Sequence, residues 1–274
     1  NQVGSNIVEH SHYTLRYNEE HEQASWVAYR LTSHQIQNPS TKRKDNFRSD
    51  PKVKTGSATL SDYKGSGYDR GHLAPAADFK WSSTAMSESF YMSNMSPQVP
   101  GFNRGIWKNM ESTVRNWAVE NDEIYIVTGP VLENTLGSIG SNRVSIPSQY
   151  YKVILDYKKP DIKGIGIIMP NEKSDASLSF YAVSIDEVER VTGIDFFPEL
   201  PDKIETRIES NINVTNWSWG KSKSYTTNKK SSFKKEVVTN DSERLPAGAS
   251  IQCSGSTKKG IRCKKKSLNA DGYC

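Results

Sequence analysis

The sequence predicts an α+β protein with one large domain over residues 1–218, followed by a basic C-terminal tail. Two patterns indicate the fold class. Short runs rich in aromatic and β-branched residues recur along the chain, as expected of strands, and the segment 102–121 has the apolar period of a helix. A third observation limits the domain: from about residue 220 to 250 the chain is rich in Ser, Thr and Lys and almost without aliphatic residues.

The domain begins with two predicted strands, Tyr13–Tyr17 and Trp26–Leu31, joined by a polar hairpin loop. The next segment, 34–51, is polar and basic, and is predicted to be a loop. Four early histidines share no period and are predicted to lie on the surface: His10, His12, His21 and His34.

The densest group of reactive residues is Tyr68-Asp-Arg-Gly-His72, which follows a glycine turn. His72 carries the side chain whose charge changes most easily near neutral pH, so it can take a proton from water. Arg70 can bind a phosphate through two parallel hydrogen bonds, and Gly71 lets the backbone approach a ligand closely. Taken alone, the motif also fits a salt-bridged surface turn with an incidental histidine.

Downstream, Ser82–Ser89 is predicted as a short helix and 90–98 as an ordered, non-repetitive segment. The strongest helix prediction is 102–121, with one apolar face formed by Ile106, Trp107, Met110, Val114 and Trp117. The rest of the domain is predicted to contain strands at 124–128, 150–157, 162–169 and 178–184, and helices at 185–193 and 203–210.

Three polar residues of the long helix, Asn103, Glu111 and Arg115, lie on or beside its apolar face. Singly, they fit a helix cap and an ordinary i,i+4 ion pair. Together with His72 they make a coherent site for cutting a phosphodiester, which needs a base, a cation for the developing charge and a metal at the leaving oxygen. Mg²⁺ keeps most of its water shell, so one or two protein oxygens are enough to hold it.

Several separated motifs resemble those of the DNA/RNA non-specific endonuclease family, and they occur in the family's order. They are Tyr68-Asp-Arg-Gly-His72, Tyr91-Met-Ser-Asn94-Met-Ser-Pro-Gln98, Phe102-Asn103-Arg-Gly-Ile-Trp107 with Glu111, Thr128-Gly-Pro130 and Ile146-Pro-Ser-Gln-Tyr-Tyr-Lys-Val153. The similarity runs from about residue 10 to 217 and extends to the endonuclease G branch. It implies a ββα-metal (His-Me finger) core within a mostly antiparallel sheet flanked by helices.

The resemblance also implies a role for each matching residue. His72 is expected to be the general base, and Asn103 the direct Mg²⁺ ligand, with Mn²⁺ as a substitute ion. Asn94 is expected to support the histidine, and Glu111 to bind metal-coordinated water. Arg30, Arg70 and Arg115 are expected to contact phosphates.

The charge of the chain is unevenly distributed. From Trp219 onward there are 13 Lys and Arg against 4 Asp and Glu, a net charge of +9, which leaves −4 of the whole-chain +5 for residues 1–218. We therefore expect a flexible basic linker at 219–250 and a small Cys- and Lys-rich motif at 251–274 that add affinity for nucleic acid but no chemistry. All three cysteines, Cys253, Cys263 and Cys274, lie in that last stretch.

The tail cysteines leave two readings open. Their Lys-rich spacing suggests a zinc knuckle, but such a site needs four ligands and no histidine follows His72. The alternative is one disulfide with a spare thiol, or an unstructured tail.

The leading function is a Mg²⁺-dependent endonuclease that cuts DNA and RNA with little sequence preference and leaves 5′-phosphate ends. Two alternatives remain: a weakly catalytic nucleic-acid-binding module on the same scaffold, and a phosphodiesterase for small substrates. No apolar run is long enough for a membrane helix, so no membrane partner is expected. Because such a nuclease endangers its own cell, export to the exterior or periplasm, or an inhibitor protein, is expected; a first residue other than Met fits a removed signal peptide.

Overall fold

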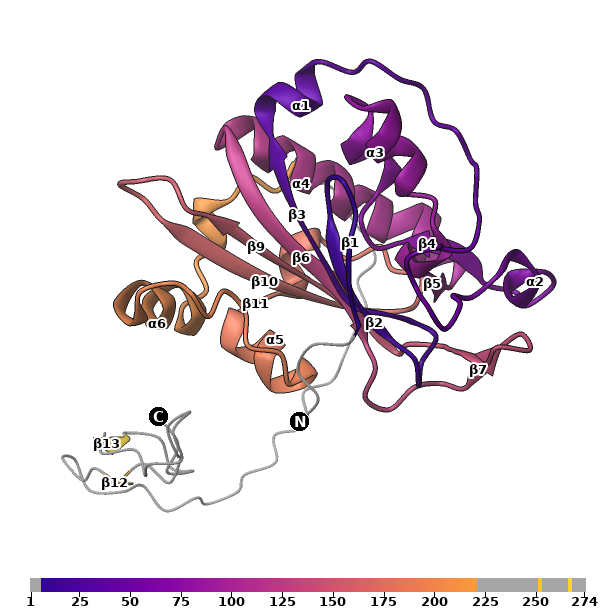
Figure 1. The fold of residues 1–274 in the computed structure, drawn as a ribbon. Coiled ribbons are helices and arrows are strands. Elements are labelled where there is room, and N and C mark those ends of the chain that lie inside the picture. Colours follow the sequence, from indigo (N-terminus) through magenta and orange to yellow (C-terminus); the bar gives the residue numbers. More distant parts are fainter. Residues whose placement is uncertain (1–5, 221–250, 253–265, 268–274) are drawn as a thin grey trace, which may run out of the picture. The chain divides into compact units, whose positions relative to one another are not determined.

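The computed structural model describes residues 6–220, 251–252 and 266–267, and the chain divides into two compact units, Asn1–Lys223 and Ser224–Cys274. The first unit is built on a seven-stranded antiparallel sheet (Figure 1). Its strands, in sheet order, are β1 (Ile7–Glu9), β2 (Thr14–Asn18), β3 (Gln23–Thr32), β6 (Glu123–Val131), β9 (Gln149–Asp156), β10 (Lys163–Pro170) and β11 (Ala182–Val183). The predicted α+β class with a central antiparallel sheet is confirmed.

Helices cover both faces of the sheet, and the central strand β9 shows why. Seven of its eight residues are buried, and successive side chains point to opposite faces. Tyr150 and Ile154 belong to the cluster that packs under helix α4 (Lys108–Glu120), whereas Tyr151 and Val153 pack with helix α5 (Ile185–Thr192). Helix α6 (Asp202–Ser210) lies beside α5 on that second face.

One long insertion between the neighbouring strands β3 and β6 builds the remaining functional elements. It contains α1 (Ser33–Gln37), α2 (Leu60–Tyr63), β4 (Asp69–His72), η1 (Ala76–Phe79), α3 (Ser83–Glu88), η2 (Met92–Asn94), β5 (Met95–Gln98), η3 (Phe102–Trp107) and α4. Strand β4 pairs antiparallel with β5, and the chain then enters η3 and α4. This two-strand and helix unit is the predicted ββα core. The other short elements are β7 (Ser138–Ile139), β8 (Val144–Ser145), η4 (Leu178–Tyr181) and η5 (Val214–Asn216) in this unit, and β12 (Ile251–Gln252) and β13 (Lys266–Ser267) in the second.

Several local predictions were wrong. The segment 102–121 is not one continuous helix, because Gly105 has non-helical torsions (φ −105°, ψ −111°) that kink the chain between η3 and α4. Only Ala182 and Val183 of the predicted strand 178–184 form a strand, because Leu178–Tyr181 form the short helix η4. The motif at 69–72 forms strand β4, as the resemblance implied, and not the surface turn that it also fits when taken alone. His10 is not a surface residue: it is buried, with Nε2 2.8 Å from Oδ2 of Asp50.

The domain extends slightly beyond the predicted boundary at 218. Trp217 and Trp219 pack on Trp117 of α4, with ring centroids 4.7 and 5.1 Å away, and Trp117 donates a hydrogen bond to the Ser218 carbonyl at 2.5 Å. Most of the predicted linker and all three tail cysteines lie outside the described residues. Among the described helices, none is long and apolar enough to span a membrane.

Candidate active site

A cavity of about 470 Å³ opens between strand β4, the segment 75–77 that follows it, the loop that carries Arg43 and the η3–α4 segment. Five cationic side chains and one carboxylate line it, beside a histidine and an asparagine. The lining residues are Arg43, Arg70, His72, Pro75, Ala76, Ala77, Asn103, Arg104, Lys108, Glu111 and Arg115. Although residues 1–218 carry a net charge of −4, five cationic side chains against one carboxylate make the lining of this cavity positive.

His72 is held in the cavity wall by packing. Its ring stands edge-on to Phe90, 5.0 Å away, and lies 5.8 Å from Phe47. Strand β4 comes close to β5 here, because a Cβ on Gly71 would lie 2.2 Å from the Gln98 side chain. Within the described residues Nε2 of His72 has no hydrogen-bond partner. Burial, with smaller effects from Arg43 and Arg70, lowers the pKa of His72 from 6.5 to about 3. The imidazole is therefore neutral at pH 7, with a lone pair available for a proton.

Asn94 supports the chain just after the histidine. Its Oδ1 accepts from the Ala74 amide, and its Nδ2 donates to the carbonyls of Ala74 and Ser89, all at 2.9 Å. Asn94 itself is fully buried, so it shapes the cavity wall without lining the cavity.

The depressed pKa of His72 makes the stability of the fold depend on pH. Below pH 6.5 the unfolded chain protonates this histidine, whereas the folded chain does not until about pH 3. The free energy of unfolding therefore falls as the pH drops through this window. Between about pH 7 and 4.5 we expect the wild type to lose roughly 2 kcal/mol more than His72→Asn in urea unfolding. Equal losses in the two proteins would show that burial does not depress this pKa.

Asn103 presents an amide oxygen to the cavity, because its amide nitrogen is already engaged. Nδ2 donates to Oδ2 of Asp69 at 2.8 Å. Arg104 binds the same carboxylate in bidentate fashion, at 2.8 and 2.6 Å. Burial raises the pKa of Asp69, but the hydrogen bonds from Arg104 and Asn103 outweigh it, so the pKa is lowered and the carboxylate stays charged. Asp69 therefore orients the Asn103 amide.

Glu111 and Arg115 lie one helical turn apart on α4 but do not form the i,i+4 ion pair that their spacing allows. Arg115 donates to Oδ1 of Asp78 at 2.8 Å, and Tyr29 of β3 donates to Oδ2 of Asp78 at 2.8 Å. No hydrogen bond within the described residues engages the Glu111 carboxylate. Burial raises the pKa of Glu111 to about 7, with the positive charge of Lys152 acting against the rise.

This donor set fits a hard divalent cation. The Asn103 amide oxygen and the Glu111 carboxylate are oxygen donors on one cavity wall, and neither is engaged in a hydrogen bond within the described residues. Mg²⁺ prefers such ligands and retains several waters, for which the cavity has room.

The site and fold agree with what comparison to known proteins shows. Residues 1–203 match the family described as DNA/RNA non-specific endonuclease. The chain belongs to this family. It is 38% identical over 212 residues to a nuclease of Nostoc sp., covering 73% of this chain and 76% of that protein. It is 35% identical over 202 residues to human mitochondrial endonuclease G, covering 69% and 68%. A chain in the crystal structure of the EndoG/EndoGI complex superimposes with a TM-score of 0.67 at 33% identity, covering 72% and 87%. The protein is thus an enzyme of the nuclease class.

The structure does not bring Arg30 to the nuclease cavity. Arg30 and Tyr29 are neighbours on β3, so their side chains point to opposite faces of the sheet. Tyr29 reaches Asp78 on the cavity side, whereas Arg30 pairs with Glu123 at the exposed surface. Arg30 is therefore not among the residues that can contact a phosphate in this cavity, which corrects the expectation drawn from the resemblance.

Arg43 stands in the cavity wall, and the sequence analysis missed it because it lies in a segment predicted only as a basic loop. The Arg43 guanidinium lies over the Phe90 ring at 4.9 Å, and that of Arg70 lies over Phe47 at 4.5 Å. The two rings that hold His72 therefore also hold the two arginines beside it. The sequence signal that could have pointed to Arg43 is a cluster of basic residues shortly before the motifs at 68–72 and 90–98. The cluster consists of Lys42, Arg43, Lys44 and Arg48.

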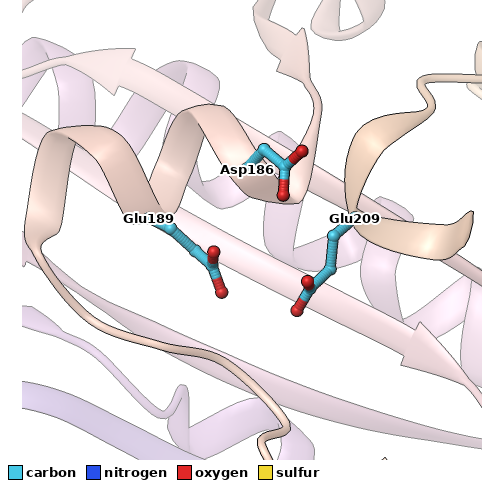
Figure 2. Close-up of side chains that lie close together, drawn as sticks. All are labelled: Asp186, Glu189 and Glu209. Carbon is cyan, nitrogen blue, oxygen red and sulfur yellow. The ribbon is translucent and has the colours of Figure 1, made fainter. Parts of the chain in front are cut away.

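A group of carboxylates lies on the opposite face of the nuclease sheet, where Asp186 and Glu189 of α5 meet Glu209 of α6 (Figure 2). Their oxygens lie within 4.8 Å of one another. Glu189 accepts a hydrogen bond from the Phe196 amide at 2.9 Å, which gives it a structural role at the end of α5. We assign no catalytic function to this group.

Proposed function

We propose that this nuclease hydrolyses phosphodiester bonds within DNA and RNA, requires Mg²⁺ and leaves 5′-phosphate ends. The observation that carries the proposal is a buried His72, whose Nε2 has no hydrogen-bond partner among the described residues, in one cavity with the oxygen donors Asn103 and Glu111. Base, metal donors and phosphate-binding cations together are what phosphodiester hydrolysis requires.

In the proposed reaction His72 takes a proton from a water molecule, and the water oxygen attacks phosphorus. The bond from phosphorus to the 3′ oxygen breaks, and that oxygen takes a proton from solvent. Arg43, Arg70 and Arg115 face the charge that builds up on the phosphate. A Mg²⁺ ion held by Asn103, with Glu111 binding its waters, would supply a Lewis acid for the leaving oxygen.

Substrate binding makes His72 a somewhat stronger base. Burial is the main cause of its depressed pKa, and the charges of Arg43 and Arg70 add smaller contributions. A phosphate between these arginines would offset their charge, so the pKa of His72 would rise by the part that they contribute, while the part due to burial stays.

Broad specificity follows from the cavity lining. Its cations recognise phosphate, which carries no base information. The planar arginines suit bidentate phosphate binding in both DNA and RNA.

The test is digestion of plasmid DNA and a structured RNA by the full chain, with and without EDTA, followed by end-group analysis. We expect both polymers to be cut internally, EDTA to stop the reaction and Mg²⁺ to restore it, with 5′-phosphate ends. Tight binding without cleavage would favour the binding-module alternative. Hydrolysis of bis(p-nitrophenyl) phosphate without preference for polymers would favour the small-substrate phosphodiesterase.

We further propose that an inhibitor protein, or export, protects the producing cell. Support comes from the charged, open cavity and from the solved relative, which was crystallised as the EndoG/EndoGI complex. The same digestion assay with added extract from the producing cell would reveal an inhibitor as a heat-sensitive loss of cleavage.

A further inference from the structure

Lys152 is a fully buried lysine in the middle of the sheet, beneath the η3–α4 helix. Lysine is almost never fully buried unless its charge is balanced. Neither the proposed reaction nor the phosphate contacts use it, so its position needs an explanation.

The surroundings of Lys152 fix its ammonium group in one place. Its Nζ donates to Oγ1 of Thr128, the residue directly opposite on β6, at 3.2 Å. The same nitrogen lies 4.3 Å from the centre of the Trp107 ring. Trp107 belongs to the η3 segment that carries Asn103, and it is followed one turn later by Glu111. The ammonium thus sits between the sheet and the helix that holds both metal donors.

Charge balance indicates what the ammonium faces. Two carboxylates and two cations act on one another here: Asp78 and Lys152 are buried, and Glu111 and Arg115 are half-buried in the cavity lining. Both oxygens of Asp78 are occupied, by Arg115 and Tyr29. Among the described residues, Lys152 forms no ion pair within 4.0 Å, and Glu111 is the carboxylate whose charge acts on it most strongly. Lys152 and Glu111 are therefore the remaining pair of opposite charges.

We propose that Lys152 is a positioning residue: its ammonium, anchored by Thr128 and Trp107, attracts the Glu111 carboxylate and holds it at the place where it binds metal-coordinated water. Without this cation Glu111 would turn toward Arg115, the other cation on its helix face. The inference rests on the proposed function, since it deepens the role given there to Glu111.

The experiment measures Mg²⁺ binding by calorimetry in the absence of nucleic acid, using the full chain. Lys152→Met keeps the length of the side chain and removes the charge. Loss of a group that orients a metal-site residue commonly weakens metal binding 10- to 100-fold, so we expect Kd for Mg²⁺ to rise about tenfold. The KM for nucleic acid at saturating Mg²⁺ should change less than about twofold, because the phosphate-binding cations are untouched.

Lys163→Met is the matched control. Lys163 also projects from a sheet strand, lies 4.9 Å from a tryptophan ring, that of Trp217, and approaches a carboxylate, Asp156, at 3.8 Å. It lies outside the cavity. Its replacement should leave Mg²⁺ binding unchanged.

A second comparison separates positioning from general support of the fold. In a Glu111→Gln background, Lys152→Met should weaken Mg²⁺ binding no further, because there is no carboxylate left to position. If Lys152→Met does not fold, Thr128→Val is measured instead. In that variant the Lys152 ammonium keeps its charge but loses its hydrogen-bond acceptor, so Kd for Mg²⁺ should rise about two- to threefold.

An unchanged Kd in folded Lys152→Met, or an equal weakening with and without Glu111, would overturn the inference. Failure of the proposed function would give a different result, because the wild type itself would then neither bind Mg²⁺ nor cleave nucleic acid.

Discussion

His72→Ala is expected to lower kcat by roughly 10²–10⁴-fold, the usual contribution of a positioned general base. The variant should still fold and bind Mg²⁺, because the ring packs against Phe47 and Phe90 and, in the part of the chain that the structure describes, Nε2 forms no hydrogen bond. The measurement is single-turnover cleavage of a labelled duplex at saturating Mg²⁺, with thermal unfolding and calorimetry as checks on fold and metal.

Two further arms make this test specific. Added imidazole should restore part of the rate, because the alanine leaves a space of the right shape beside the arginines. His34→Ala, at an exposed position on α1, is the matched control and should be fully active. A His72→Ala protein that keeps more than about a tenth of the wild-type rate would remove His72 from the role of base.

Asn103→Ala is expected to act through the metal. The amide oxygen is the donor that Asp69 turns toward the cavity, and alanine has no oxygen to replace it. At low Mg²⁺ the rate should fall by roughly 10²-fold, while a large excess of Mg²⁺, or Mn²⁺, should recover part of it. The measurement is the cleavage rate as a function of metal concentration.

Asn109→Ala supplies the control for Asn103, since Asn109 lies on helix α4, which follows η3 directly, and is exposed to solvent. Its metal dependence should match that of the wild type. If Asn103→Ala lowered the rate equally at every Mg²⁺ concentration, the residue would act on substrate or fold, and another group would have to hold the ion.

The sequence was most informative where chemistry is concentrated in short motifs. Asp69–His72, Asn94 and Asn103–Glu111 occur in the order found in the DNA/RNA non-specific endonuclease family, and this resemblance implied the ββα unit and the antiparallel sheet. The runs of aromatic and β-branched residues, which fit a buried pleated surface, predicted several of the strands.

The sequence could not predict the contacts between segments that are far apart in the chain. Arg30 was expected to contact phosphate because of the family resemblance, yet the face to which a strand residue points depends on how the sheet is covered. Arg43 reaches the site through a loop whose path is set by Phe90. The kink at Gly105 and the pairing of Arg115 with Asp78 likewise depend on tertiary packing.

The placement of every cavity-lining residue inside the insertion between β3 and β6 has a consequence for folding kinetics. Thr32 and Glu123, at the two ends of the insertion, face each other across neighbouring strands. Pairing these strands closes a long loop, so this step carries a large entropic cost and is expected to be slow. The site also depends on the sheet, because Tyr29 of β3 holds Asp78 and, through it, Arg115. During refolding, cleavage activity should therefore return no earlier than the pairing of β3 with β6, so a chain that has not yet closed this loop is unable to cut nucleic acid.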